Sequence, residues 1–284
     1  MQAIGIVFET VLLQPLASGL IVFYKIFGNN MGLAIVLFTI FLKIVLNPLT
    51  KPYMESMKKM KDVAPSLQKL KEKHKGDKVK LAQAQADLYK QNKINPAGGC
   101  LPYLLQIVIL IAFFNVFSRT LYPNIDMVAS FNKLVYAPLR FSEGQIINTK
   151  FLYLDVRAYD TICSKPDCPI NLPFIPFTLP GPLLLTAAII QFLSAKITSP
   201  LVKEEEKFAK KTKGEMDDMQ VSMQKSMIYM FPLMTIFIGL KFPSGLALYW
   251  LLFSLMQAIQ QVRSQGWGGL TPFIKRLGLL KSTA

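Results

Sequence analysis

The feature of this chain that most constrains its fold is a series of apolar blocks, each close to the length of a membrane span. The clear blocks are Met31–Thr50, Gly99–Ser118, Phe177–Ile197, Ser226–Leu240 and Gly245–Val262. A helix of about 20 apolar residues crosses the roughly 30 Å of hydrocarbon in a bilayer. Charged residues make up only 17% of the chain, against about a quarter in a soluble domain. Because backbone polar groups in lipid must be satisfied within their own segment, the blocks predict five membrane-spanning helices.

The first residues of the chain form a less regular apolar stretch. Within residues 1–27, Glu9 and Pro15 interrupt the apolar sequence. No basic residue precedes Lys25, so the stretch lacks the charged start of a signal peptide. We expect an amphipathic helix over Ile4–Phe27 that lies in the membrane interface. A sixth span is the alternative.

The net charge of +15 is unevenly distributed. Residues 51–95 hold twelve lysines and five acidic residues, whereas residues 119–172 hold six basic and five acidic residues. After Val262 there are four basic residues and no acidic one. Because Lys and Arg concentrate on the cytoplasmic side of a membrane, we place 51–95 and the tail inside and 119–176 outside. With five spans, the N-terminus is then outside and the C-terminus cytoplasmic.

The predicted fold class is an all-α polytopic membrane protein, a five-span helical bundle with a cytoplasmic helical hairpin and an N-terminal interfacial amphipathic helix. The first predicted segments are the extracytoplasmic amphipathic helix at 1–27, a span at 28–50, the hairpin at 51–95 and a span at 96–118. An extracytoplasmic loop at 119–176, a span at 177–198 and a cytoplasmic loop at 199–225 follow. The last are spans at 226–240 and 241–262 and a cytoplasmic basic tail at 263–284.

Residues 52–91 show helical periodicity on both sides of a turn at Lys75-Gly76-Asp77. In the second helix the apolar positions with this spacing are Val79, Ala82, Ala86 and Tyr89. The first helix contains three methionines, a side chain that suits surfaces for varied apolar partners; they are Met54, Met57 and Met60. We interpret them as a substrate-receiving surface, with packing inside the hairpin as the alternative. The lysines favour anionic lipid headgroups, and contact with ribosomal RNA is the alternative.

One cation, Lys43, falls inside the first span, seven residues before Thr50 and thus about 10 Å from its cytoplasmic end. None of the five blocks contains an acidic residue. A charge at this depth is costly unless water or carbonyl groups solvate it. Thr39 and Asn47 share its helical face at i−4 and i+4. A polar cavity is therefore one interpretation, and snorkelling of the lysine to the interface is the other.

Other spans contain polar positions that match this face. They are Gln106 in the second span, Gln191 and Ser194 in the third, and Trp250, Ser254, Gln257 and Gln261 on one face of the fifth. Such stripes also form plain hydrogen bonds between helices. Taken with Lys43, they predict a positively charged, hydrated groove in the cytoplasmic half of the bundle. A small transporter or anion channel that uses the same groove is the alternative function.

The sequence offers little for catalysis. The one histidine, His74, lies beside a lysine-rich turn, and neither a GxxxxGK[ST] nor a GxSxG string occurs. No Cys or His spacing suggests a metal site. Cys163 and Cys168 could form a disulfide in the external loop or remain free thiols. We therefore predict no enzyme activity, no metal and no cofactor.

Four strings occur in an order that resembles the YidC/Oxa family of membrane protein insertases. They are Phe41-Leu-Lys-Ile-Val-Leu-Asn-Pro-Leu49, the lysine-rich hairpin, Asn95-Pro-Ala-Gly-Gly-Cys-Leu-Pro102 ahead of Gln106, and Phe242-Pro-Ser-Gly-Leu-Ala-Leu-Tyr-Trp250. The resemblance covers about residues 5–262. The absence of a large external domain is similar to the shorter, five-span bacterial members.

The resemblance implies a chaperone that helps hydrophobic nascent segments enter the bacterial plasma membrane. Its implied partners are nascent membrane proteins and the lipid bilayer, with the Sec translocon and the ribosome as candidates, and no small-molecule substrate is expected. The groove residue of the family is usually arginine, and Lys43 stands at the matching position. Lysine keeps the charge but lacks the planar fork of donors.

Overall fold

The structure is a computed structural model of the whole chain, and it describes residues 2–74, 77–94, 101–163, 170–171, 178–197, 228–276 and 278. The chain forms two compact units. Unit 1 comprises Met1–Val45, Leu105–Ile190 and Pro232–Met256, and unit 2 comprises Leu46–Leu104, Gln191–Phe231 and Gln257–Ala284. Each unit is described by itself below.

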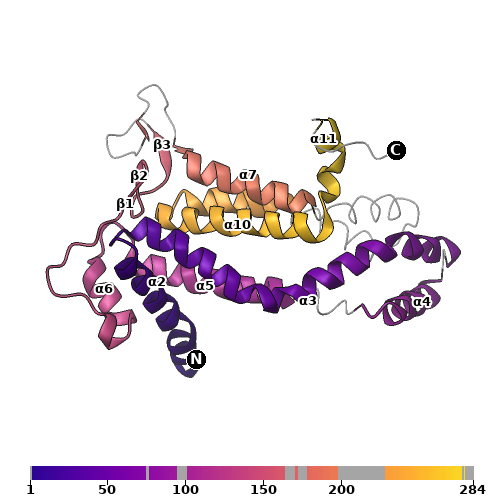
Figure 1. Cartoon of the computed structure of the whole chain (residues 1–284), viewed down its shortest axis with the longest axis horizontal. Coiled ribbons are helices and arrows are strands. Elements are labelled where there is room, and N and C mark those ends of the chain that lie inside the picture. The colour runs from indigo at the N-terminus through magenta and orange to yellow at the C-terminus, as the bar shows by residue number, and fades with distance from the viewer. Residues whose placement is uncertain are drawn as a thin grey trace. The chain divides into compact units, whose positions relative to one another are not determined.

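Helices make up most of the described chain (Figure 1). The first are α1 (Gln2–Phe8), the π-helical turn η1 (Glu9–Leu13), α2 (Gln14–Ile26), α3 (Met31–Lys73) and α4 (Lys78–Gln91). They are followed by α5 (Leu101–Thr120), α6 (Met127–Leu134), η3 (Ala137–Leu139) and α7 (Pro182–Ile197). The last are a helix over Ile228–Gly239, α10 (Ser244–Gln265), the 3-10 turn η4 (Gly268–Leu270) and α11 (Thr271–Arg276).

Among the described residues, three helical segments are long and apolar enough to cross a membrane: Gly5–Ile26, Met31–Pro52 and Ser244–Ser264. Shorter apolar helices cover Ile107–Thr120, Pro182–Ile197 and Ile228–Gly239. The predicted fold class, an all-α polytopic membrane protein, is confirmed. The number of spans stays a prediction, because Gly5–Ile26 has the length and composition of a sixth.

The first predicted span does not end as a helix at Thr50. Helix α3 continues to Lys73, so the span and the first hairpin helix are one element. It contains Pro48, Pro52 and Pro65, each of which removes one backbone donor from the helix ladder. The residues around these prolines keep helical geometry. The hairpin is therefore joined to the membrane by continuous helix.

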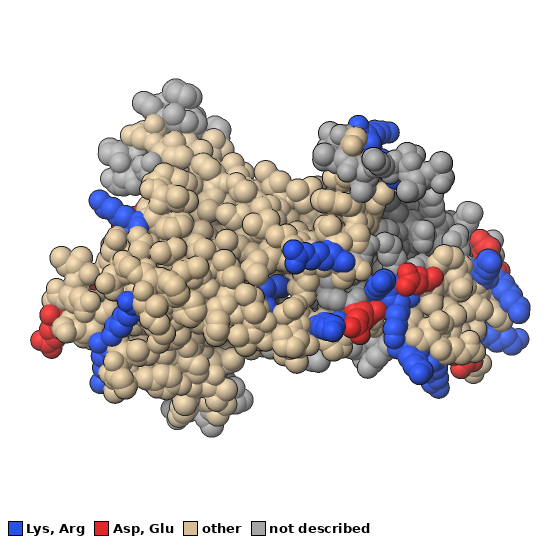
Figure 2. Space-filling model, viewed as in Figure 1, with Lys and Arg blue, Asp and Glu red and all other residues tan. Residues whose placement is uncertain are grey.

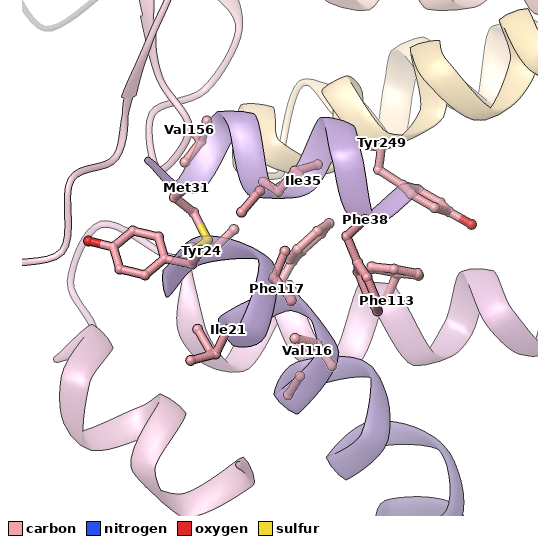
Figure 3. Close-up of a cluster of buried hydrophobic side chains, with 14 of the residues drawn as sticks. Ile21, Tyr24, Met31, Ile35, Phe38, Phe113, Val116, Phe117, Val156 and Tyr249 are labelled. Atoms are coloured by element: carbon pink, nitrogen blue, oxygen red, sulfur yellow. The ribbon is translucent and has the colours of Figure 1, made fainter. Parts of the chain in front are cut away.

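The core of unit 1 is formed mainly by α2, α3, α5, α6 and α10, with Val156 from the segment between α6 and α7; Figure 3 shows part of it. The rings of Phe113 on α5 and Tyr249 on α10 stack with centroids 4.3 Å apart, and Phe113 also contacts Phe38 on α3. Small residues let the helices approach closely: a Cβ on Gly19 would lie 2.6 Å from Cε2 of Phe38. Between spans, such van der Waals packing replaces the water exclusion that drives soluble folds.

The N-terminal helix α2 crosses α3 and α5 at a steep angle (Figure 1). Two of its side chains bind the segment after α5, since Ser18 Oγ accepts from the amide of Tyr136 and Tyr24 Oη accepts from the amide of Asn148. Farther along, Glu9 pairs with Arg119 at 3.5 Å. The interfacial placement of this helix stays a prediction.

The segment predicted as an external loop contains short strands, and one more strand lies at the start of the predicted third span. β1 (Lys150–Phe151) pairs antiparallel with β2 (Leu154–Asp155), and β3 (Thr161–Cys163) lies between β4 (Ile170–Asn171) and β5 (Leu179–Pro180). Runs of two or three residues were too short to show a strand period in the sequence. The strands are therefore an addition to the predicted loop at 119–176, whose place outside the membrane stays a prediction.

This segment closes over the start of α10. The amides of Ser244 and Gly245 donate to the carbonyls of Ala158 and Val156, at 2.7 and 2.9 Å. These bonds satisfy two donors that the first turn of a helix leaves open. Arg157 Nη2 donates to three carbonyls just after α5, those of Tyr122, Pro123 and Ile125. Within the string Phe242–Trp250, Ser244 and Gly245 thus bind the segment between α5 and α7.

In unit 2, α4 follows the end of α3 as the second helix of the hairpin (Figure 1). Asp77 caps it, because its Oδ1 accepts from the amide of Lys80 at 3.0 Å. The predicted apolar face was wrong for Val79, Ala82 and Ala86, which are exposed, whereas its fourth member Tyr89 is half-buried together with Leu81 and Leu88. Larger side chains one position away take the inner face. Figure 2 shows Lys and Arg gathered over this hairpin.

Candidate functional site

Lys43 lies twelve residues into α3, and only 8% of it is exposed. Its ammonium Nζ is 4.2 Å from the centre of the Phe253 ring on α10. A cation over an aromatic face gains about 0.5–2 kcal/mol, and more where water is excluded. Within unit 1, α3 and α10 run side by side in one direction, because Ile35 also lies beside Gly245. Lys43 therefore points between helices, not along α3 to an interface.

Three other predicted groove residues of unit 1 are buried around this lysine on the same two helices. Thr39 is one turn before Lys43, and its hydroxyl donates to the carbonyl of Ile35 at 2.6 Å. Trp250 and Ser254 lie three residues before and one residue after Phe253. A buried cation and two hydroxyls in an apolar helix pair are expensive in lipid. Such residues are typical of a functional site in a membrane protein.

In unit 2, the polar residues of the predicted groove form bonds between helices. Ser194 Oγ on α7 donates to Oε1 of Gln261 on α10 at 2.7 Å, and both residues are buried. Gln260 Nε2 donates to Asn47 Oδ1 at 2.9 Å and lies 3.2 Å from Thr50 Oγ1 on α3. These bonds hold α7 and α3 to the second half of α10. They fit the alternative interpretation of the polar stripe, in which its residues form hydrogen bonds between helices.

Several predicted site residues have partial or no description. Gln191 and Gln257 are half-buried. The side chains of Gln106 and of the hairpin methionines Met54, Met57 and Met60 lie outside the described part of the chain. Cys163 is disulfide-bonded, but Cys168 lies outside the described residues, so their pairing stays a prediction.

Sequence reasoning missed Phe253 and Gln260. The predicted stripe on the fifth span runs through Trp250, Ser254 and Gln257, whereas Phe253 and Gln260 lie seven residues apart on the neighbouring face. An aromatic residue beside a polar stripe is no signal by itself. Only the pairing of α3 with α10 brings the ring to the lysine.

A second buried charged residue lies in the segment between α5 and α7 of unit 1. Asp160 is 1% exposed; its Oδ2 accepts from the amide of Leu184 at 2.6 Å, and its Oδ1 accepts from the Tyr153 hydroxyl at 2.9 Å. Burial raises the pKa of Asp160. The carboxylate holds the external strands to the first turn of α7. Among the described residues, no group of three or more His, Cys, Asp or Glu could hold a metal ion.

Comparison with known proteins agrees with this architecture. The model of a family described as "60Kd inner membrane protein" matches residues 22–266. A protein of Fusobacterium nucleatum named "Membrane protein insertase YidC" is 34% identical over 233 residues, which are 82% of this chain and 85% of that protein.

Longer relatives of the same name match as well. The chain is 31% identical over 261 residues to one from Pelobacter propionicus and 35% identical over 242 residues to one from Shewanella sp. (strain ANA-3). These matches cover 92% and 85% of this chain but only 40% and 35% of the relatives. The chain thus spans less than half the length of these two proteins. It is a multi-pass membrane protein that belongs to the 60Kd inner membrane protein family, the YidC/Oxa insertase family that its motifs resemble.

Proposed function

We propose that this chain is a membrane protein insertase that receives hydrophobic nascent segments from the cytoplasm and releases them sideways into the bilayer without nucleotide hydrolysis. The observation that supports it most is Lys43, a buried cation in an apolar helix. Family membership supports the same activity. The proposed groove of unit 1 consists of Thr39, Lys43, Trp250 and Ser254.

Lys43 attracts the short hydrophilic end of a substrate, above all an acidic one. Two unit charges 4 Å apart interact with about 4 kcal/mol at an effective dielectric constant of 20. Buried surroundings keep bulk water and salt from screening this attraction. The Phe253 ring stabilises the ammonium while the groove has no substrate.

The same helix also offers a face for lateral release. Phe41, Ile44 and Val45, which flank Lys43 in sequence, are 46%, 63% and 51% exposed. An apolar segment can therefore leave the polar face and pass along an apolar one into lipid. Its burial drives this step with about 25 cal/mol per Å² of apolar surface. The proposed receiving surface on the cytoplasmic side is the methionine-bearing helix of the hairpin.

The proposed location is the plasma membrane of a bacterium, with the N-terminus outside and the hairpin and C-terminus in the cytoplasm. The charge distribution supports this orientation, since residues 51–95 hold twelve lysines against five acidic residues. Nascent membrane proteins and the bilayer are the proposed partners. The Sec translocon and the ribosome are further candidates that the family suggests.

A depletion-rescue assay tests the proposal with a substrate whose translocated end is acidic. We expect Lys43→Arg to restore insertion, Lys43→Ala to restore it weakly and Lys43→Glu to fail. Lys150→Glu is the matched control, because Lys150 is an exposed lysine of unit 1 outside the proposed groove. If Lys43→Glu rescued as well as the wild type, the proposed attraction would be wrong.

A further inference from the structure

The region that the insertase proposal does not use is the segment after the fifth predicted span, from Arg263 to Arg276 in unit 2. Arg263, Lys275 and Arg276 are exposed, and no acidic residue occurs after Val262. Two aromatic side chains between these cations are also exposed, Trp267 by 36% and Phe273 by 60%. Basic residues with exposed aromatic side chains between them are typical of segments that lie in a membrane interface.

This segment is held at the end of a membrane helix. Gly268 has φ +49°, and a Cβ on it would overlap the carbonyl oxygen of Ile197, the last residue of α7. The turn η4 thus packs on the carboxyl end of α7 through its backbone. Ile274, only 9% exposed, faces inward from α11. Phe273, Lys275 and Arg276 are left on the outer side.

Residues near Ile197 mark this level as a membrane–water interface. Lys196 lies against two aromatic rings, with Nζ 5.3 Å from the centre of Phe192 and 5.5 Å from that of Tyr229. Tyr229 begins an apolar helix and is half exposed. Lysine and tyrosine at the ends of apolar helices are typical of the headgroup level. Trp267 lies on the turn that contacts the same end of α7.

We propose that the segment Arg263–Arg276 is an interfacial anchor that binds anionic phospholipid headgroups. Trp267 and Phe273 enter the boundary between headgroups and acyl chains, and Arg263, Lys275 and Arg276 pair with lipid phosphates. The charge of the segment is complementary to the anionic cytoplasmic leaflet. The anchor fixes the carboxyl ends of α7 and α10 at the membrane surface. It needs no insertase activity, so it can fail while the proposed function stands.

The test uses Trp267 as its own probe. The chain has two tryptophans, so Trp250→Phe leaves Trp267 as the single emitter. The full chain is reconstituted in vesicles of phosphatidylcholine alone or of phosphatidylcholine with equal phosphatidylglycerol. In each set, some lipids are brominated near the headgroup end of the acyl chain. We expect stronger quenching by bromine and weaker quenching by aqueous iodide in the anionic vesicles.

In the same background, Arg263→Gln, Lys275→Gln and Arg276→Gln are combined. Each charge removed should lower the ratio of docked to undocked segment about fivefold in anionic vesicles. High salt should also lower this ratio for the unsubstituted segment, because it screens the attraction between the charges. The matched control combines Lys58→Gln, Lys59→Gln and Lys69→Gln, three exposed lysines of the hairpin. It changes the net charge equally and should leave Trp267 quenching unchanged.

Three results would overturn the anchor. One is equal access of iodide to Trp267 in neutral and anionic vesicles. Another is quenching by bromine that the triple substitution leaves unchanged. The third is shielding of Trp267 that develops only when ribosomes are added, which would assign the basic segment to RNA. Phe273→Ser gives a second reading, because it should reduce quenching by bromine in both kinds of vesicle.

Discussion

Asp160 offers a quantitative test of how the segment between α5 and α7 stabilises the start of α7. Asp160→Ala removes the acceptor for the Leu184 amide and for the Tyr153 hydroxyl. Loss of a cap at a helix start costs about 0.5–2 kcal/mol. A buried hydroxyl without its partner adds about 1–3 kcal/mol. Burial of the carboxylate offsets part of the gain from these bonds, so we expect the variant to lose about 2–4 kcal/mol of unfolding free energy.

The pH dependence has a definite sign. Burial raises the pKa of Asp160, so the unfolded chain ionises this group at a lower pH than the folded chain does. Its contribution to stability is therefore fully present below the unfolded pKa of about 4 and is lost as the pH rises through the folded pKa. Asp160→Asn cannot ionise, and its stability should fall less with rising pH than that of the wild type.

The assay is denaturant unfolding in mixed micelles, followed by circular dichroism across this pH range. The control is Asp126→Asn, because Asp126 also caps a helix, accepting from the Ala129 amide at 3.0 Å, but is exposed. Asn caps as well as Asp, so the control should follow the wild type. A loss of less than about 0.5 kcal/mol of unfolding free energy in Asp160→Ala, the range of an ordinary surface change, would contradict this role of Asp160. So would parallel curves of unfolding free energy against pH for Asp160→Asn and the wild type.

Three further changes have clear expected outcomes. Gly181→Ala places a Cβ against the Asp160 carboxylate; it should cost about 1–3 kcal/mol in micelle unfolding, and Asp160→Ala should suppress much of that loss in the double variant. Phe253→Leu removes the ring beneath Lys43 and should lower unfolding free energy by about 0.5–2 kcal/mol, with Phe253→Tyr close to wild type as the control. Asp77→Ala removes the cap of α4 and should raise hydrogen exchange in its first turn, at a cost of about 0.5–2 kcal/mol.

Apolar periodicity and the lengths of the apolar blocks were enough to predict the all-α membrane class, because both depend on a local pattern that a sequence contains. For Lys43 the sequence left two interpretations open, a polar cavity and snorkelling to the interface. The length of α3 was not predictable in the same way, because prolines lower helix propensity without determining where a helix ends. In the structure Pro48 and Pro52 remain inside α3.

The partners of the polar residues depend on which helices are neighbours. Ser194 was a candidate groove residue, and only the pairing of α7 with α10 shows that its hydroxyl donates to Gln261. Phe253 is apolar, so it was not among the polar positions considered for the groove. The short strands and the Asp160 contacts depend on residues far apart in sequence. Asp160 and Leu184 are separated by 24 positions, which no local period connects.

The central claim is that the charge of Lys43 draws the hydrophilic end of a substrate into the groove. The most direct measurement uses the purified chain alone in proteoliposomes, with protease protection of a single-span substrate as the readout. Wild type and Lys43→Glu are each given substrates whose short translocated end is acidic or, by substitution, basic. We predict that Lys43→Glu inserts less of the acidic substrate and more of the basic one than the wild type does, which reverses the wild-type preference. If both proteins insert the two substrates in the same ratio, Lys43 does not act through its charge.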